Sequence, residues 1–192
     1  MQVSCGIATF LFTDIEGSSR LWEEDPERMK FALARHDAIC RAIVGSHQGL
    51  IVKTTGDGVY AAFDDAFDAV AAALTLQETL ANPEATLGLA LPLRCGLHLG
   101  IAERRDNDFF GAPLNRAARI MAAAHGGQTL LSEAVANVIA DRLRDGVTLR
   151  DLGNVRLRDL SRPEHVYQLV HPKLRADFPV SSHAILTRFR AV

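Results

Sequence analysis

Apolar and polar positions alternate along the chain in a way that predicts short strands and amphipathic helices. Residues 7–13 form an apolar, β-rich run, which is typical of a buried strand. Asp25 and Pro26 indicate a helix start, because Asp is a favourable N-cap and Pro fits the first helical position. Residues at spacings of three and four then mark one face of that helix, namely Met29, Leu33, His36, Cys40 and Ile43.

The pattern after Gly49 predicts a hairpin followed by a second helix. Residues 50–54 and 59–63 are strand-like, and they flank a tight turn that holds Asp57 between two glycines. Asp65 is the expected N-cap of a helix that ends before Pro83. The expected inner face of this helix consists of Phe67, Val70, Leu74 and Leu80.

Residues 91–101 predict a further long strand, and residues 102–111 predict a polar loop. A third helix is expected from Pro113 to about His125, where two consecutive glycines end it. The order βαββαβ predicts an α/β fold, an α+β sandwich with a ferredoxin-like core. Beyond this core we expect a helix over 132–143 and short strands over 147–152, 155–157 and 165–170.

The hydrophobic pattern fades after Pro172, so we expect one domain over residues 1–172 and a tail or linker over 173–192. Hydrophobic residues make up 48% of the chain and the formal net charge is −2, which indicates a globular protein and disfavours a nucleic acid polymer as partner. We expect the three widely spaced cysteines to be buried free thiols in a reducing compartment.

The chain shows no apolar run long enough to cross a bilayer, and it begins without the pattern of a signal peptide. We therefore expect a cytoplasmic protein without direct membrane insertion. The sequence also lacks several binding and catalytic motifs. It has no phosphate-binding GxxxxGK[ST] loop, no serine nucleophile elbow, no histidines at the spacing of a zinc site and no aromatic RNA-binding stretch.

Two carboxylates stand at the ends of predicted strands. Asp14 ends the first strand and Asp57 lies in the hairpin turn, and a ferredoxin-like sheet places these strands side by side. Two carboxylates at close range repel each other, and Mg²⁺ supplies the opposing charge together with an affinity for oxygen ligands and phosphates. For either Asp alone, the role of a turn former is the better interpretation. The pair in this topology favours a metal site.

Three further pairs are candidates for nucleotide recognition. Gly17 and Ser18 lead into helical sequence, so their backbone N–H groups can point at a phosphate. On the third helix Asn115 and Arg119 are four residues apart and share a face, unlike the adjacent Arg116. Lys53 and Asp108 form a donor and an acceptor complementary to adenine. The Gly17–Ser18 motif alone is weak, since many strand-turn-helix junctions share it. For Asn115 and Arg119 the spacing alone favours a solvated helix face, and Lys53 and Asp108 also fit two ordinary surface charges.

These residues lie in blocks that resemble the class III adenylyl/guanylyl cyclase catalytic domain of bacterial soluble cyclases. The resemblance extends over about residues 7–172, and several blocks in order are more specific than any one of them. The blocks are FLFTDIEGSSRLW (10–22), GLIVKTTGDGVYAAF (49–63), RCGLHLG (94–100), DFFGAPLNRAARI (108–120), GQTLLS (127–132) and LGNVRLR (152–158).

The resemblance implies a role for each candidate. Asp14 and Asp57 would bind two Mg²⁺ or Mn²⁺ ions, with help from the backbone carbonyl of Ile15. Lys53 and Asp108 would select adenine, Asn115 would orient the ribose, and Arg119 would stabilise charge on the α-phosphate. Gly17 and Ser18 would meet the β- and γ-phosphates. Arg158 would hold the terminal phosphates, although Asp159 follows it where the family commonly has Gly.

The implied reaction converts ATP to 3′,5′-cyclic AMP and pyrophosphate. In the family the site lies between two protomers, so the resemblance implies a head-to-tail homodimer with shared sites. Phe109 and Phe110 fit such an interface, and for one of them packing in the core of its own chain fits equally well. The alternatives are a guanylate or other nucleotide cyclase, and a catalytically silent nucleotide-binding or dimerisation module.

Overall fold

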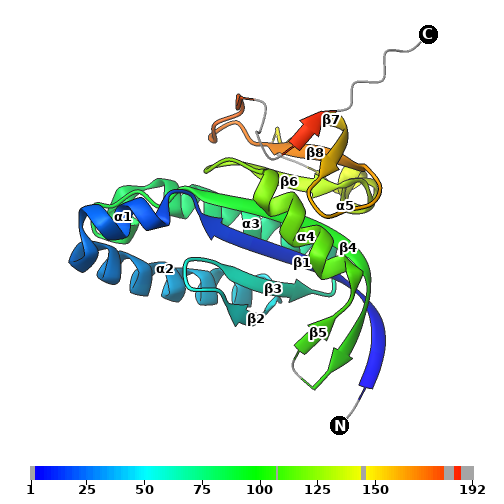
Figure 1. Cartoon of the computed structure of the whole chain (residues 1–192), viewed down its shortest axis with the longest axis horizontal. Coiled ribbons are helices and arrows are strands. Elements are labelled where there is room, and N and C mark those ends of the chain that lie inside the picture. The colour runs from blue at the N-terminus through cyan, green and yellow to red at the C-terminus, as the bar shows by residue number, and fades with distance from the viewer. Residues whose placement is uncertain (1–2, 107, 144–145, 180–183, 187–192) are drawn as a thin grey trace.

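The computed structural model describes residues 3–106, 108–143, 146–179 and 184–186 (Figure 1). The described helices and strands follow the chain in this order: β1 (Val3–Ile15), α1 (Ser18–Glu24), α2 (Pro26–Ser46), β2 (Leu50–Thr54), β3 (Val59–Phe63), α3 (Ala66–Ala81), the 3₁₀ helix η1 (Pro83–Thr86), β4 (Leu93–Arg105), β5 (Asp108–Phe110), α4 (Ala112–Ala123), β6 (Thr129–Ser132), α5 (Glu133–Ile139), the 3₁₀ helix η2 (Ala140–Arg142), β7 (Thr148–Leu157), β8 (Glu164–Val170) and β9 (Ala184–Leu186).

The described strands form one sheet in the order β2-β3-β1-β4-β6-β8-β7-β9, with β5 paired to β4. In the first four strands of this order each strand is antiparallel to its neighbours, and they give the ferredoxin-like βαββαβ core that the sequence predicts. Strand β6 joins β4 in parallel and extends the sheet toward the C-terminal strands. The predicted α/β fold class is therefore confirmed, including the additional C-terminal helix and strands.

Helices cover both faces of the sheet (Figure 1). On one face, α2 and α3 pack over alternate residues of β1, of which Leu11 and Ile15 are buried in the same cluster as Met29. On the opposite face, α4 packs on Phe10 of β1 through Ala117. Asp14 therefore points to the α4 side of the sheet, because it alternates with Thr13 and Ile15 along β1.

Two of the predicted helix starts, at Asp25 and Asp65, are confirmed by their capping hydrogen bonds. The Asp25 carboxylate accepts from the backbone N–H of Arg28 at 3.0 Å, and Pro26 is the first residue of α2. The Asp65 carboxylate accepts from the backbone N–H of Phe67 at 2.8 Å. The predicted inner face of α2 is likewise confirmed, because its five residues are buried or half-buried.

The predicted inner face of α3 is confirmed by the same measure. Val70 and Leu80 are buried, and Phe67 and Leu74 are half-buried and pack against the core. The buried side of the helix also holds four alanines and Leu76, which the sequence analysis did not name.

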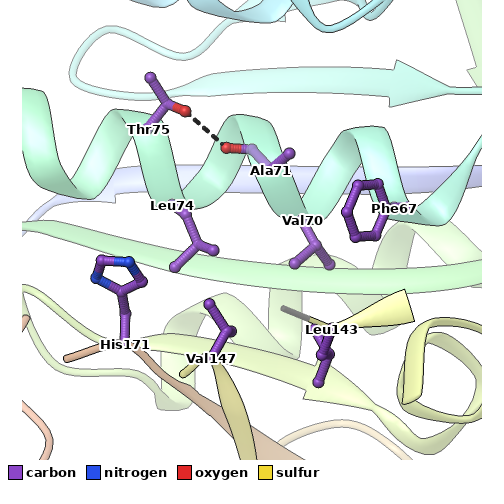
Figure 2. A pocket seen from close by; sticks show the side chains of 8 residues that line it. All are labelled: Phe67, Val70, Ala71, Leu74, Thr75, Leu143, Val147 and His171. Carbon is purple, nitrogen blue, oxygen red and sulfur yellow. Dashed lines mark hydrogen bonds between the residues drawn. The ribbon is translucent and has the colours of Figure 1, made fainter. Parts of the chain in front are cut away.

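Phe67, Val70 and Leu74 of α3 line an apolar groove of about 220 Å³ between this helix and the C-terminal part of the domain (Figure 2). Leu143 and Val147 form the opposite wall, and His171 closes one end. His171 is paired with Glu78 at 3.3 Å. The groove is not lined by any of the candidate site residues.

The predicted polar loop over 102–111 is wrong. Strand β4 continues to Arg105, and β5 pairs back onto it, with Arg105 opposite Asp108. Polar residues occupy this hairpin because it projects beyond the helices, so both of its faces are largely outside the core (Figure 1). The two strands predicted over 147–152 and 155–157 are one strand, β7, with a register shift between Asp151 and Asn154.

The segment after Pro172 contacts the domain. The carbonyl oxygen of Ala176 accepts from Arg150 at 2.8 Å and from Gln168 at 2.7 Å, and β9 pairs with β7. The domain boundary at residue 172 stays a prediction. The cysteines differ from the expectation in one respect, because Cys40 and Cys95 are buried but Cys5 is exposed.

Candidate active site

The end of β1 and the turn between β2 and β3 bring Asp14 and Asp57 together. The backbone N–H of Ile15 donates to the carbonyl oxygen of Asp57 at 3.1 Å. Next to this bond, a Cβ on Gly58 would lie 1.9 Å from the carbonyl oxygen of Thr13. Only glycine permits this approach of the turn to β1, and the approach places the two carboxylates beside each other.

The surroundings of Asp14 raise the pKa of its carboxyl group. Burial is the largest cause, and the neighbouring Asp57 carboxylate adds to it by repulsion, whereas the Arg94 guanidinium acts in the opposite direction. The Asp57 carboxylate accepts a hydrogen bond from the Ser18 hydroxyl at the start of α1. The two carboxylates thus share a half-buried site in which an additional positive charge is favourable.

Arg94 is a site residue that the sequence analysis missed. It lies directly opposite Asp14 in the β1–β4 register and forms an ion pair with it. Residues directly opposite in neighbouring strands point to the same face, which explains the contact. The available signal was a single charged residue within the apolar run 91–97, where an unpaired charge would be costly.

Lys53 and Asp108 form an ion pair of 2.5 Å between their side chains, so the structure brings this predicted pair together. Lys53 follows a β-bulge in β2, and Asp108 opens β5 on the projecting hairpin. The Lys53 ammonium group lowers the pKa of the Asp108 carboxyl. Below the pair, Tyr60 is the register partner of Lys53 and stacks on Phe12 with ring centroids 4.6 Å apart.

Asn115 and Arg119 lie on α4. This helix crosses β4 at close range at Gly96, where an added Cβ would lie only 2.2 Å from the backbone nitrogen of Met121, so the position requires glycine. Asn115 is exposed. The Arg119 guanidinium lies 2.8 Å from the carboxylate of Asp159, which lies 3.7 Å from Arg158. The structure therefore brings together two arginines predicted to contact phosphates.

Arg116 behaves differently from Arg119, as the helical spacing predicts. Its side chain pairs with Glu164 of β8 at 3.1 Å. Gly17 precedes α1 with a φ of 74°, and Ser18 is the first residue of that helix, so the predicted lead into a helix is confirmed.

A profile of the family described as "Adenylate and Guanylate cyclase catalytic domain" matches residues 3–171. The chain belongs to this family. An uncharacterized protein of Mycobacterium tuberculosis is 41% identical to this cyclase domain over 176 residues, an alignment that covers 91% of the chain and 59% of the relative. The chain therefore spans less than two thirds of that relative's length.

Solved cyclase structures share the fold of this cyclase domain. A structure of adenylate cyclases from Trypanosoma brucei in their monomeric state gives a TM-score of 0.81 at 28% identity, and covers 91% of this chain and 92% of that one. An adenylate/guanylate cyclase/hydrolase from Silicibacter pomeroyi gives a TM-score of 0.74 at 31% identity, and covers 88% and 99%. The neighbours and the topology agree on the fold.

The candidate residues of this cyclase domain form three separate groups. The first holds Asp14, Asp57 and Ser18, the second is the Lys53–Asp108 pair, and the third lies on α4 and the turn after β7. Among the described residues, no hydrogen bond or ion pair joins a member of one group to a member of another.

The first group suits hard divalent cations. Its side-chain donors are carboxylate oxygens, and their mutual repulsion together with the raised pKa of Asp14 favours an additional positive charge. Among the described residues, no third Asp, Glu, His or Cys joins them to form a larger cluster. Such a small protein donor set is typical of Mg²⁺ sites that also take oxygens from substrate phosphates.

Within the same described ranges, no helix has the length and apolar character to cross a bilayer.

Proposed function

We propose that the chain is the catalytic domain of an adenylate cyclase, which converts ATP to 3′,5′-cyclic AMP and pyrophosphate. The observation that carries the proposal is the convergence of Asp14 and Asp57 in a domain of the cyclase family. The Lys53–Asp108 pair supports adenine as the base. The Trypanosoma brucei structures, named as adenylate cyclases, agree with that substrate.

Asp14, Asp57 and the backbone carbonyl of Ile15 would hold two Mg²⁺ or Mn²⁺ ions. Bound there, such ions supply acidification of the ribose 3′-hydroxyl and neutralisation of the charge on the leaving pyrophosphate. The two carboxylates must be ionised to hold them, and Arg94 favours ionisation of Asp14. Ser18 fixes the orientation of the Asp57 carboxylate through its hydroxyl.

The remaining residues would position ATP for attack of the ribose 3′-oxygen on the α-phosphorus. The Lys53 ammonium would donate to a ring nitrogen of adenine, and the Asp108 carboxylate would accept from the exocyclic amino group. Asn115 would hydrogen-bond the ribose, and Arg119 would stabilise the charge that develops on the α-phosphate. Arg158 and the N–H groups at Gly17 and Ser18 would hold the β- and γ-phosphates.

The separation of the three groups supports a homodimer with shared sites, in which one protomer supplies the carboxylates and the other supplies Lys53, Asp108, Asn115 and Arg119. An exposed apolar surface supports the same assembly. Ile7 and Ile101 face each other in the β1–β4 ribbon and are 66% and 67% exposed, and Phe110 on β5 is 41% exposed. Phe109 instead packs in the core against Phe10, with ring centroids 5.5 Å apart.

A turnover assay tests the proposal. Purified protein with ATP and Mn²⁺ or Mg²⁺ should form cyclic AMP and pyrophosphate, measured by chromatography, and Asp14→Ala should lower kcat at least about a hundredfold because it removes a metal ligand. Asp64→Ala is the matched control, since Asp64 is exposed after β3, and it should keep wild-type activity. Full activity of Asp14→Ala would rule out the metal assignment.

A further inference from the structure

Asp159 holds two arginines of the proposed phosphate site. Its carboxylate lies 2.8 Å from the Arg119 guanidinium and 3.7 Å from that of Arg158. The three side chains are accessible to a ligand, because Arg119, Asp159 and Arg158 are 40%, 58% and 79% exposed. The two arginines come from different parts of the chain, α4 and the turn after β7, and the Asp159 carboxylate pairs with both.

The backbone at Asp159 is specialised for this position. Its φ of 60° lies in the left-handed region, which residues other than glycine seldom adopt, although Asp and Asn tolerate it best. The turn around it closes with a hydrogen bond of 3.3 Å from the N–H of Leu160 to the carbonyl oxygen of Leu157. This turn fixes Asp159 beside Arg119, and a glycine would fit the same backbone without supplying a charge.

A carboxylate held by guanidinium groups resembles a phosphate oxygen in the same place, because both are anionic acceptors that arginine binds through paired N–H donors. We propose that Asp159 is an internal competitor for the substrate's phosphate groups, which must displace it from Arg119 and Arg158 before they bind. The inference rests on the proposed function. Asp159 is thus a positioning residue that weakens the binding of ATP and of the pyrophosphate product.

The size of the effect follows from the exposure of the ion pair. Exposed ion pairs contribute little free energy, so their removal should strengthen phosphate binding only about two- to fivefold. Asp159→Asn keeps the shape of the side chain and tolerates the left-handed backbone, and Asp159→Gly fits it as well. Both variants should lower the Kd for inorganic triphosphate and the KM for ATP by this factor, with a smaller change in kcat.

Calorimetric titration of the full chain with inorganic triphosphate tests the inference without relying on turnover. Asp177→Asn is the matched control, because it removes the same charge from an exposed ion pair with Arg150 of 3.1 Å, and it should leave the Kd unchanged. In an Arg119→Ala background the gain from Asp159→Asn should shrink. Thermal unfolding checks that each variant is folded.

The outcomes distinguish the competitor role of Asp159 from the proposed cyclase activity. Unchanged or weaker triphosphate binding in both folded Asp159 variants would overturn the competitor role of Asp159, even if cyclic AMP forms. An equal gain in Asp177→Asn would also overturn it, because the effect would then be one of net charge. Tighter binding in the Asp159 variants without any cyclisation would support the competitor and contradict the proposed enzyme.

Discussion

The substitution Asp108→Asn tests base recognition, because it replaces one terminal oxygen of the side chain by an NH₂ group. The side chain then no longer accepts hydrogen bonds through both terminal atoms. We expect wild type to prefer ATP over GTP, and the variant to lose about tenfold of that preference, which is the size of one hydrogen bond to a charged group.

The measurement is kcat/KM for the two nucleotides in competition, with CTP and UTP included. Asp106→Asn is the control, because Asp106 is exposed on the same hairpin and keeps a φ of 53° that Asn tolerates. A wild-type preference for GTP would refute the assignment of Lys53 and Asp108 to adenine.

His98 makes the domain sensitive to acid. Burial on β4 lowers its pKa to about 4, and the positive charge of Arg116 adds to the effect. The unfolded chain binds this proton at an ordinary pKa of about 6.5, so stability is present above that pH and is lost as the pH falls toward 4. Burial lowers the pKa of His36 as well, so this residue also favours a loss of stability as the pH falls.

We therefore expect the free energy of unfolding of wild type to decrease between pH 6.5 and 4 more steeply than that of His98→Gln, measured by urea denaturation. Because the carboxylates contribute equally to both proteins, the difference between the two curves isolates His98. Parallel curves would show that His98 is not held neutral in the folded state.

Sequence reasoning located individual site residues where a strand end or a turn limits the possible positions. Asp14 and Asp57 are of this kind, since a hairpin beside the first strand leaves them few alternatives. Arg94 and Asp159 were not predictable as partners. Their contacts depend on the register between β1 and β4 and on the path of α4 relative to β7, which the pattern of a single segment does not determine.

At the scale of elements, Gly58 determines how close the hairpin comes to β1. A methyl group there would meet the carbonyl oxygen of Thr13, so Gly58→Ala should push the turn away and separate Asp57 from Asp14. We expect a loss of about 2 kcal/mol in stability, typical of overpacking, and a large loss of cyclase activity. Chemical denaturation and the turnover assay measure the two effects.

Gly6→Ala provides the comparison for this element. Gly6 lies in β1, the strand that the turn at Gly58 approaches, but no atom stands within 4 Å of a Cβ added there. Its stability should change by no more than about 0.5 kcal/mol, as for other unconstrained surface positions. If both variants behaved alike, close approach of the turn would not be what Gly58 provides.

Strands and helix starts were the most predictable elements. The bounds expected for the two strands at 50–54 and 59–63 agree with the structure, because the apolar runs end at glycines and polar residues. The β4–β5 hairpin was missed because its residues are polar on a ribbon with little core contact. The larger residues on the inner face of α3 were predicted, but the buried alanines beside them were not, because alanine carries a weak hydrophobic signal.

At the scale of the whole molecule, the separated groups predict that an active site needs two chains. Asp57→Ala and Asn115→Ala proteins should each be inactive, because each lacks one half of every site in its own dimer. Mixed in equal amounts with free exchange, half of the dimers carry one intact site, so activity should return to about a quarter of wild type.

The control mixes Asp57→Ala with Asp14→Ala, both of which damage the carboxylate half. This mixture should stay inactive. Recovery in the control, or none in the first mixture under conditions in which subunits exchange, would count against shared sites.

Strand β1 pairs with β4 without interruption from Val3 to Ile15, with Asp14 near one end and the exposed Ile7 toward the other. Side chains alternate between the two faces, so a slip of one residue would turn Asp14 toward α2 and α3. No intermediate alignment retains the hydrogen bonds. The carboxylate is therefore placed in an all-or-none manner, so gradual changes in the geometry of the candidate site would have to come from the parts that meet β1, not from β1 itself.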